Sequence, residues 1–146
     1  MMKQLSDEEL NELIFFLKNE GSKGMRTRYC DSLSSIRILM DNQVDKKYSY
    51  KSMNQFLINE LKIKKPMASY LINVAKKFYL PGGEIKPFYK GFQFTALTEL
   101  LKYNDSELEM MKQHNLIHKD LKRSDRDTLR VEYLKLLEEN NKQREI

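Results

Sequence analysis

The chain has 146 residues, a formal net charge of +5, 40% hydrophobic residues and 32% charged residues, which fits one domain with a single core, although two small helical lobes would also fit this length. Only five glycines and three prolines interrupt it, which disfavours a β fold with many turns. No apolar run has the length of a membrane span and the opening MMKQLSDEEL is too acidic for a signal peptide, so we expect a cytoplasmic protein that does not bind membranes.

The first predicted helix covers residues 6–20. Ser6 and Glu9 match the capping-box pattern at its start. Its core face is a stripe at helical spacing: Leu10, Leu13, Ile14 and Leu17. Phe15 and Phe16 widen that face; we favour their packing against the next helix, and contact with a partner chain is the alternative hypothesis. Residues 21–24, GSKG, are expected to end the helix.

A second helix is predicted from residue 25 to about residue 42. Its apolar positions recur at intervals of three or four: Met25, Tyr29, Leu33, Ile36 and Met40. Three arginines accompany it, Arg26, Arg28 and Arg37. We favour solvated positions for them, and contact with phosphates is the alternative. Residues 44–50 predict a polar connector.

Residues 52–79 are the centre of the chain and predict a helix-turn-helix. Its first helix, opening at Lys51 and ending near Leu61, is followed by Ile63 at the corner. The second helix begins at Pro66, ends near residue 80, and buries one face: Ala68, Leu71, Ile72, Ala75 and Phe78. The other face carries groups that can bind phosphates or base edges: Ser69, Tyr70, Asn73, Lys76 and Lys77. Any buried helix pair would share this amphipathy, so the pattern alone does not define the function.

The start of that second helix lacks a capping side chain. Pro66 fits the first helical position, and Lys65 before it has no oxygen to accept a backbone N–H. Elsewhere the sequence predicts two more capping boxes, at Ser106 with Glu109 and at Ser124 with Asp127. An uncapped helix start beside Lys64 and Lys65 is suited to a DNA phosphate. A water-capped surface helix with incidental lysines is the alternative.

The positive charge is concentrated in this region. Residues 62–90 contain seven lysines and one acid, Glu84, which gives +6 and leaves −1 for the rest of the chain. Such a distribution is typical of nucleic-acid binding proteins, and a solvated charged face is the simpler explanation.

Residues 84–94, EIKPFYKGFQF, interleave aromatic residues with lysines. We expect either an arm or hairpin lying on DNA, or aromatic side chains that fill the core below the next helix. Three further helices are predicted over residues 95–103, 106–114 and 124–140, and a connector between the last two buries Leu116, Ile117 and Leu121.

The segment LINELKIKKPMASYLINVA resembles the helix-turn-helix of bacterial repressor and partition-type proteins. Through residue 112 the layout is similar to the helical region of ParB/KorB-type proteins, with the landmarks Leu80-Pro81, Gly91 and Leu100-Leu101. Two residues depart from that pattern, because Lys62 stands where the turn usually has glycine and Ile58 stands where a smaller residue is usual. The chain also lacks the nucleotide-binding box of ParB. The resemblance implies a DNA-binding regulator of a bacterial phage, plasmid or other mobile element.

No pattern for catalysis or cofactor binding is visible in the sequence. His114 and His118 have the spacing of a helical metal pair, but Asn115 predicts a helix end between them and no cysteine or appropriate glutamate is near. The serines of residues 32–35 have no histidine or acidic partner pattern. We therefore expect neither an enzyme, nor a metal site, nor a cofactor.

These patterns together predict an all-α fold of six or seven helices in one domain, residues 1–146. The predicted function is sequence-specific binding of double-stranded DNA by a homodimer, because reading an operator usually takes two half-sites. Eight residues form the predicted DNA site, with Met67 contacting a thymine methyl: Lys64, Lys65, Met67, Ser69, Tyr70, Asn73, Lys76 and Lys77. The alternative is a small adaptor or inhibitor whose basic face binds an acidic protein.

Overall fold

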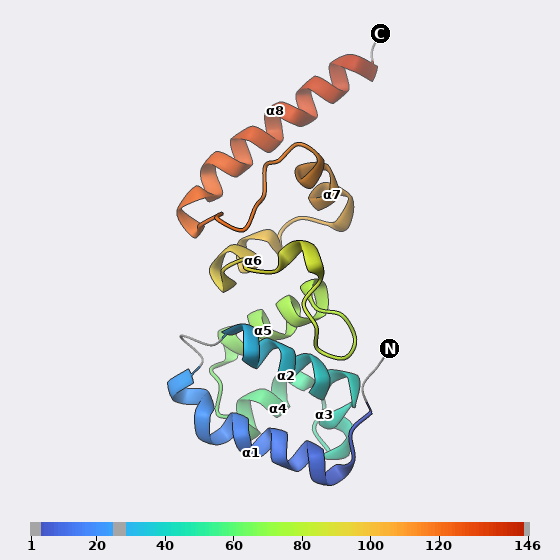
Figure 1. Ribbon diagram of the computed structural model, residues 1–146, viewed down its shortest axis with the longest axis vertical. Helices are drawn as coiled ribbons and strands as arrows, with labels where there is room; N and C mark the ends of the chain where they lie inside the picture. The colour runs from blue at the N-terminus through green and yellow to red at the C-terminus, as the bar shows by residue number, and fades with distance from the viewer. Residues whose placement is uncertain (1–3, 25–28, 145–146) are drawn as a thin grey trace. The chain divides into compact units, whose positions relative to one another are not determined.

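The chain is all-α, as the sequence predicts (Figure 1). The computed structural model describes residues 4–24 and 29–144, with side chains for 4–18, 33–122 and 124–141. Within these ranges there are eight α-helices, no strand, and short 3-10 helices at Pro87–Tyr89 and Arg123–Asp125. One domain was predicted; the fold has two compact units, divided between Phe88 and Tyr89.

The N-terminal unit contains five helices. Helix α2 contacts α1, α3 and α5, and α4 packs on α3 and α5 (Figure 1). Leu33, Ile36 and Leu39 of α2 are fully buried, so this helix is central to the unit's core. The bounds of the five helices are α1 Asp7–Gly24, α2 Tyr29–Asp41, α3 Val44–Lys47, α4 Met53–Glu60 and α5 Lys65–Phe78.

Helix α1 begins as predicted and ends later than predicted. The Ser6 hydroxyl accepts the Glu9 N–H at 3.2 Å and the Glu9 carboxylate accepts the Ser6 N–H at 3.1 Å, which completes the predicted capping box. The helix continues through Gly24 instead of ending at residue 20. A glycine weakens a helix by only about 1 kcal/mol, so the two glycines of residues 21–24 do not end it. The predicted helix start at Met25 lies outside the described residues, as do Arg26 and Arg28.

The segment predicted as a polar connector contains the short helix α3. Gln43 precedes it in a left-handed conformation, with φ 51°, and Val44 is fully buried. A single apolar residue among polar neighbours gives no helical period, and for this reason the sequence pattern did not predict α3.

The C-terminal unit contains α6 Phe94–Leu100, α7 Asp105–Gln113 and α8 Arg126–Arg144. Its core includes eight apolar side chains at the expected helical positions or in the connector: Leu97, Leu100, Leu108, Met111, Ile117, Leu121, Leu129 and Leu136. Leu116 is only partly buried. Helix α8 extends beyond residue 140, where the sequence predicted its end.

Two predicted capping boxes in this unit are wrong. Helix α7 is capped two residues earlier than predicted, because the Asn104 side chain accepts the Glu107 N–H and the Glu107 carboxylate accepts the Asn104 N–H. Ser124 lies inside a 3-10 helix, where the Asp125 carboxylate accepts the Lys122 N–H at 2.9 Å. Asparagine caps a helix as well as serine does, so the motif fitted two registers.

Tyr133 of α8 connects that helix to α7, since its hydroxyl donates to the Glu107 carboxylate at 2.8 Å. Burial first, and then this hydrogen bond, raise the pKa of Tyr133 to about 12. The phenol ionises near pH 10 when unfolded. The resulting stabilisation is therefore complete below about pH 10 and is lost as the pH rises through about 12.

Tyr133→Phe should lower the free energy of unfolding by about 1 kcal/mol at neutral pH. It should also flatten the loss of stability above pH 10, as measured by urea unfolding at a series of pH values. Tyr70→Phe, at an exposed position, is the control. An unchanged alkaline slope in Tyr133→Phe would show that this hydroxyl does not contribute to the pH dependence.

Candidate nucleic-acid interface

Helices α4 and α5 are joined by the four residues 61–64, at the place where the sequence predicts two helices and a turn. The Ser52 hydroxyl caps α4 by accepting the Gln55 N–H at 3.2 Å. Phe56 and Leu57 of α4 are fully buried. The Leu57 carbonyl accepts the Ile63 N–H at 3.2 Å, so the turn is hydrogen-bonded to the end of α4.

Lys62 adopts a left-handed conformation in this turn, with φ 58°. Its side chain is exposed, and the residue stands where glycine is usual in the motif that the sequence resembles. A side chain in this region costs about 1 kcal/mol or more, because Cβ approaches the following carbonyl oxygen.

Lys62→Gly should therefore raise the free energy of unfolding by about 1 kcal/mol relative to Lys62→Ala. Both variants remove the same charge, so their difference reports the backbone conformation of residue 62 and not its charge. Urea unfolding of the two variants under identical conditions is the measurement. Equal stability would mean that residue 62 is not strained in solution.

Helix α5 starts without a side-chain cap, as predicted, but one residue earlier. Lys64 is the capping position, with φ −65° and ψ 145°, and makes no side-chain cap hydrogen bond. Lys65 is the first helical residue and Pro66 follows it, whereas the sequence analysis placed the cap at Lys65. Lys64 and Lys65 are both exposed. Proline is tolerated throughout the first turn, so its presence did not fix the register.

One side of α5 is buried against the N-terminal unit, where the helix contacts α2 and α4. Five of its side chains are fully buried: Ala68, Leu71, Val74, Ala75 and Phe78. Four of these were predicted. Val74 was missed, and the predicted Ile72 is only partly buried. The side chains that face outward are therefore fixed in direction by a well-packed inner face.

The outer side of α5 brings together most of the predicted DNA site. Tyr70 is 48% exposed, Asn73 and Lys76 are exposed, and Ser69 and Lys77 are partly exposed. Their spacings of three, four and seven residues place them on one side of the helix. We call these five residues the outer face of α5.

Met67 lies apart from the outer face. It is partly buried and precedes Leu71 by four residues and Val74 by seven, so it shares the inner side of the helix with two fully buried residues. Its predicted contact with a thymine methyl remains a prediction, and it would depend on the exposed part of the side chain.

Three exposed lysines lie at the start of α5 and on its outer face: Lys64, Lys65 and Lys76. Among the described side chains, no carboxylate forms an ion pair with Lys64, Lys65 or Lys76. Each lysine is exposed, so its charge is not neutralised within the protein. Lysines in this state can exchange their counterions for phosphate groups.

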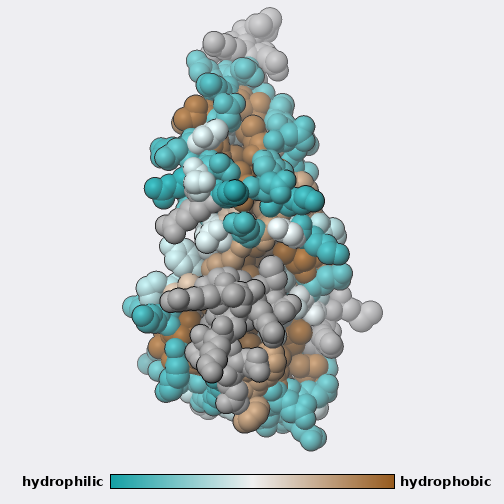
Figure 2. All heavy atoms as spheres, turned by 60° about the vertical axis from the view of Figure 1, so that its left-hand side comes forward, coloured by the Kyte–Doolittle hydropathy of each residue, from teal (hydrophilic) through white to brown (hydrophobic). Residues whose placement is uncertain are grey.

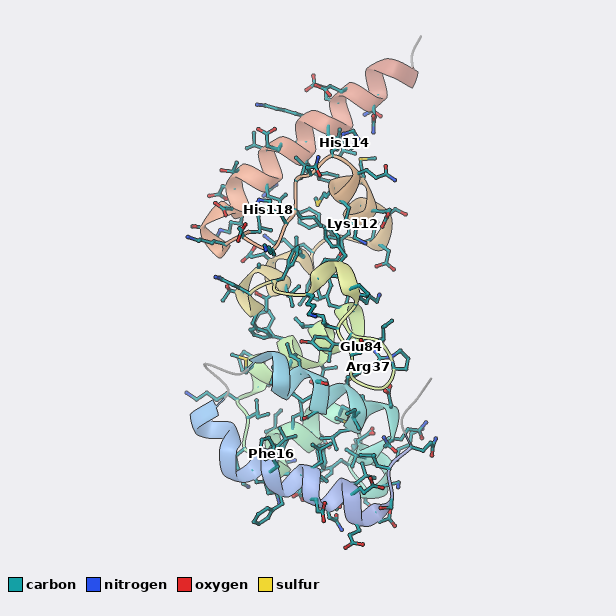
Figure 3. The ribbon with its side chains drawn as sticks, viewed as in Figure 1. Phe16, Arg37, Glu84, Lys112, His114 and His118 are labelled. Carbon is teal, nitrogen blue, oxygen red and sulfur yellow. The ribbon has the colours of Figure 1, made fainter. Side chains whose placement is uncertain are left out.

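The last turn of α5 is held by a group that the sequence analysis missed. Arg37 of α2 donates to the carbonyls of Ala75 at 3.4 Å and Lys76 at 3.2 Å, and its Nε donates to Asp41 at 3.1 Å. The other Asp41 oxygen accepts the Gly82 N–H at 2.8 Å. Their side chains are only 15% and 6% exposed, so Arg37 (labelled in Figure 3) is not the solvated cation that the sequence predicted.

The loop after α5 fits closely against α2. The Ser34 hydroxyl donates to the Gly83 carbonyl, and a Cβ at Gly83 would lie 2.8 Å from the Ser34 carbonyl oxygen. Gly83 also has φ 94°, so both its conformation and its surroundings require glycine. Together with Arg37 and Asp41, this contact fixes the C-terminal end of α5 within the unit.

The expected arm after α5 is a tight loop closed by one antiparallel bridge between Tyr79 and Ile85. Of the four aromatic residues expected either on DNA or in the core, Tyr89, Phe92 and Phe94 are buried and Phe88 is 39% exposed. Burial raises the pKa of Tyr89 to about 12. The structure thus favours the core position for three of these side chains.

A second polar cluster connects α1 to α4. Glu60 accepts hydrogen bonds from Lys18 at 2.9 Å and from the Tyr50 hydroxyl at 2.7 Å. These bonds, that of Lys18 first, lower the pKa of Glu60. The C-terminal end of α4 is therefore tied to α1 through Lys18 and to the chain before α4 through Tyr50.

Other chemistry is sparse in the described part of the chain. Within it, no three of the His, Cys, Asp and Glu side chains are grouped so that they could hold a metal ion. His114 follows α7 and His118 lies in the connector after it (Figure 3). No described helix combines the length and apolar character needed to cross a membrane.

Comparison of the chain with protein-family models, with curated proteins and with solved structures gave no match in any of the three. The resemblance to repressor and partition-type proteins therefore remains a prediction from the residues of the motif.

Proposed function

We propose that this protein binds double-stranded DNA in a sequence-specific manner and regulates transcription or maintenance of a mobile element. The observation that carries the proposal is the two-sided character of α5, with five fully buried side chains opposite a polar, basic outer face. A rigid helix with such a face fits the major groove of B-DNA, which admits one α-helix.

In the proposed complex the outer face of α5 contacts the bases. Asn73 is suited to adenine, because its amide can donate and accept at the same base edge. Ser69 and Tyr70 supply hydroxyl groups, and Lys76 and Lys77 bind the flanking phosphates. The contacts of α5 with α2 support this proposal, since a fixed helix holds these groups in one geometry.

The N-terminal end of α5 is proposed as a phosphate contact. Pro66 has no N–H, so the Met67 N–H is the group that a side chain at the cap Lys64 would bind. A DNA phosphate in that position would be favoured by the helix dipole and by Lys64 and Lys65.

Lys64→Ser should stabilise the protein by about 1 kcal/mol relative to Lys64→Ala, because serine caps the helix. The serine variant should also bind duplex DNA several-fold more weakly than the alanine variant, since its hydroxyl occupies the N–H that the phosphate would use. Fluorescence anisotropy at one salt concentration measures both affinities. Equal affinity of the two variants for DNA would mean that the N-terminal end of α5 does not contact a phosphate.

The competing function is that of an adaptor whose basic face binds an acidic protein. Binding to DNA and binding to an acidic protein both weaken with salt, so salt dependence alone separates the two functions poorly. Competition titrations with duplexes of different sequence distinguish them better. A sequence-specific DNA-binding protein should bind any duplex weakly and one sequence at least a thousandfold more tightly. An adaptor should show no sequence preference.

A homodimer is part of the proposal, because two outer faces would read the two halves of a palindromic operator. Nothing in the α4–α5 motif itself identifies the surface between the two copies.

A further inference from the structure

Helix α1 exposes two adjacent aromatic side chains. Phe15 is 69% exposed and Phe16 is 48% exposed, whereas Leu10, Ile14 and Leu17 on the opposite side of the helix are buried. The sequence pattern favoured packing of both rings against the next helix, but the structure leaves much of each ring exposed to water. Phe16 is labelled on α1 in Figure 3.

A third aromatic residue lies beside this helix. Tyr48 is 40% exposed, and its hydroxyl donates to the Asn11 side chain of α1. Asn11 precedes Phe15 by one helical turn. Phe15, Phe16 and Tyr48 are the aromatic patch of α1.

A patch of this kind favours a protein partner. Hydrophobic side chains form separate patches on the largely hydrophilic face drawn in Figure 2. Scattered exposed apolar residues are common, but neighbouring aromatic rings are enriched at protein interfaces. The free energy available from burying such rings is large, because each carries a large apolar area.

The charges around the patch favour a second copy of this chain. Glu12 is exposed one turn before Phe16, and Lys18 is three residues after Phe15 with 44% of its side chain exposed. If two α1 helices pack antiparallel with Phe15 against Phe15, Glu12 of each copy lies opposite Lys18 of the other. The two-fold axis forms this attractive pair twice.

We propose that the aromatic patch of α1 is the surface on which a second copy of this chain docks, in an antiparallel arrangement. This inference rests on the homodimer of the proposed function and names its surface, and association through that surface requires no DNA. Lys18 can serve both copies because an ammonium group has three donors and only one is used by Glu60 at 2.9 Å.

Helix α8 offers the matched control. Val131 and Leu134 are 51% and 52% exposed and three residues apart, so they form an aliphatic pair of similar exposure in the other unit. If exposure alone determined association, this pair would serve equally well.

The experiment is sedimentation equilibrium of the full chain without DNA, from micromolar to near-millimolar concentration. The wild type should approach twice the monomer mass of 17.5 kDa. Phe15→Ser with Phe16→Ser should raise the dimer dissociation constant at least about tenfold, and Glu12→Lys should raise it by a smaller factor that disappears at high salt. Val131→Ser with Leu134→Ser should leave it unchanged.

Circular dichroism at low protein concentration controls for folding, because replacement of largely exposed rings should leave the helical signal intact. A monomeric wild type over the whole range would overturn the proposal. So would a dimer that survives the Phe15 and Phe16 replacements, or one that is lost when Val131 and Leu134 are replaced. A monomer that still prefers one DNA sequence would retain the DNA contacts proposed for α5, while overturning this interface and the proposed homodimer.

Discussion

Asp41→Ala is expected to lower the free energy of unfolding by about 3 kcal/mol. It leaves the Arg37 guanidinium, 15% exposed, without its carboxylate, and it removes the acceptor of the Gly82 N–H. Removal of one partner from a buried ion pair typically costs about 3–5 kcal/mol, because the other charge stays buried. Because Arg37 is partly exposed, we expect a loss at the lower end of this range.

Urea unfolding of the wild type and two single variants tests this expectation. Asp7→Ala is the matched control, since Asp7 pairs with Lys47 at 2.9 Å while its side chain is 86% exposed. That surface pair should contribute less than about 1 kcal/mol. If Asp41→Ala were no more destabilising than Asp7→Ala, the clamp on the end of α5 would not contribute to the fold.

Replacement of Asn73, Lys76 and Lys77 by alanine should weaken binding to a preferred duplex by about a hundredfold at moderate salt. Loss of an amide that reads a base costs about 1–3 kcal/mol. Each lysine that leaves a phosphate should reduce the salt slope of the affinity by about one. Asn73 and Lys76 are exposed and Lys77 is partly exposed, and none of the three belongs to the buried face of α5, so the changes should not disturb the core.

Anisotropy titrations at several salt concentrations separate the two contributions. Asn73→Ala alone should relax sequence preference and leave the salt slope unchanged. Lys76→Ala with Lys77→Ala should reduce the slope by about two and weaken all duplexes alike. Lys119→Ala with Lys122→Ala removes the same charge from exposed positions in the C-terminal unit. An equal loss of DNA affinity in the Lys119 and Lys122 variant would mean that overall charge, and not the outer face of α5, determines binding.

The sequence predicted the features that depend on local spacing. Ala68, Leu71, Ala75 and Phe78 follow a helical period and are fully buried, so periodicity alone assigned the inner face of α5. The Ser6 cap of α1 was also predicted, because the capping box is a contact between residues three apart. The same rule failed at α7, where Asn104 and Ser106 both fit the pattern and the cap is Asn104.

The features that depend on residues far apart in sequence were not predicted. Arg37 binds a carbonyl 39 residues away and Ser34 binds one 49 residues away. Nothing in the local pattern distinguishes Arg37 from a solvated arginine, because its role exists only once α2 and α5 are packed. The cap of α5 is Lys64 and not the predicted Lys65 for a different, local reason, since proline is compatible with more than one position in the first turn.

Selection from a library of random duplexes tests whether the outer face of α5 reads a DNA sequence, with the wild type and the Asn73, Lys76 and Lys77 triple alanine variant compared side by side. We expect the wild type to enrich a palindromic consensus and the variant to lose this enrichment while keeping its helical signal. Absence of any enrichment by the folded wild type would contradict sequence-specific DNA binding and would favour an acidic protein as the partner of the outer face of α5.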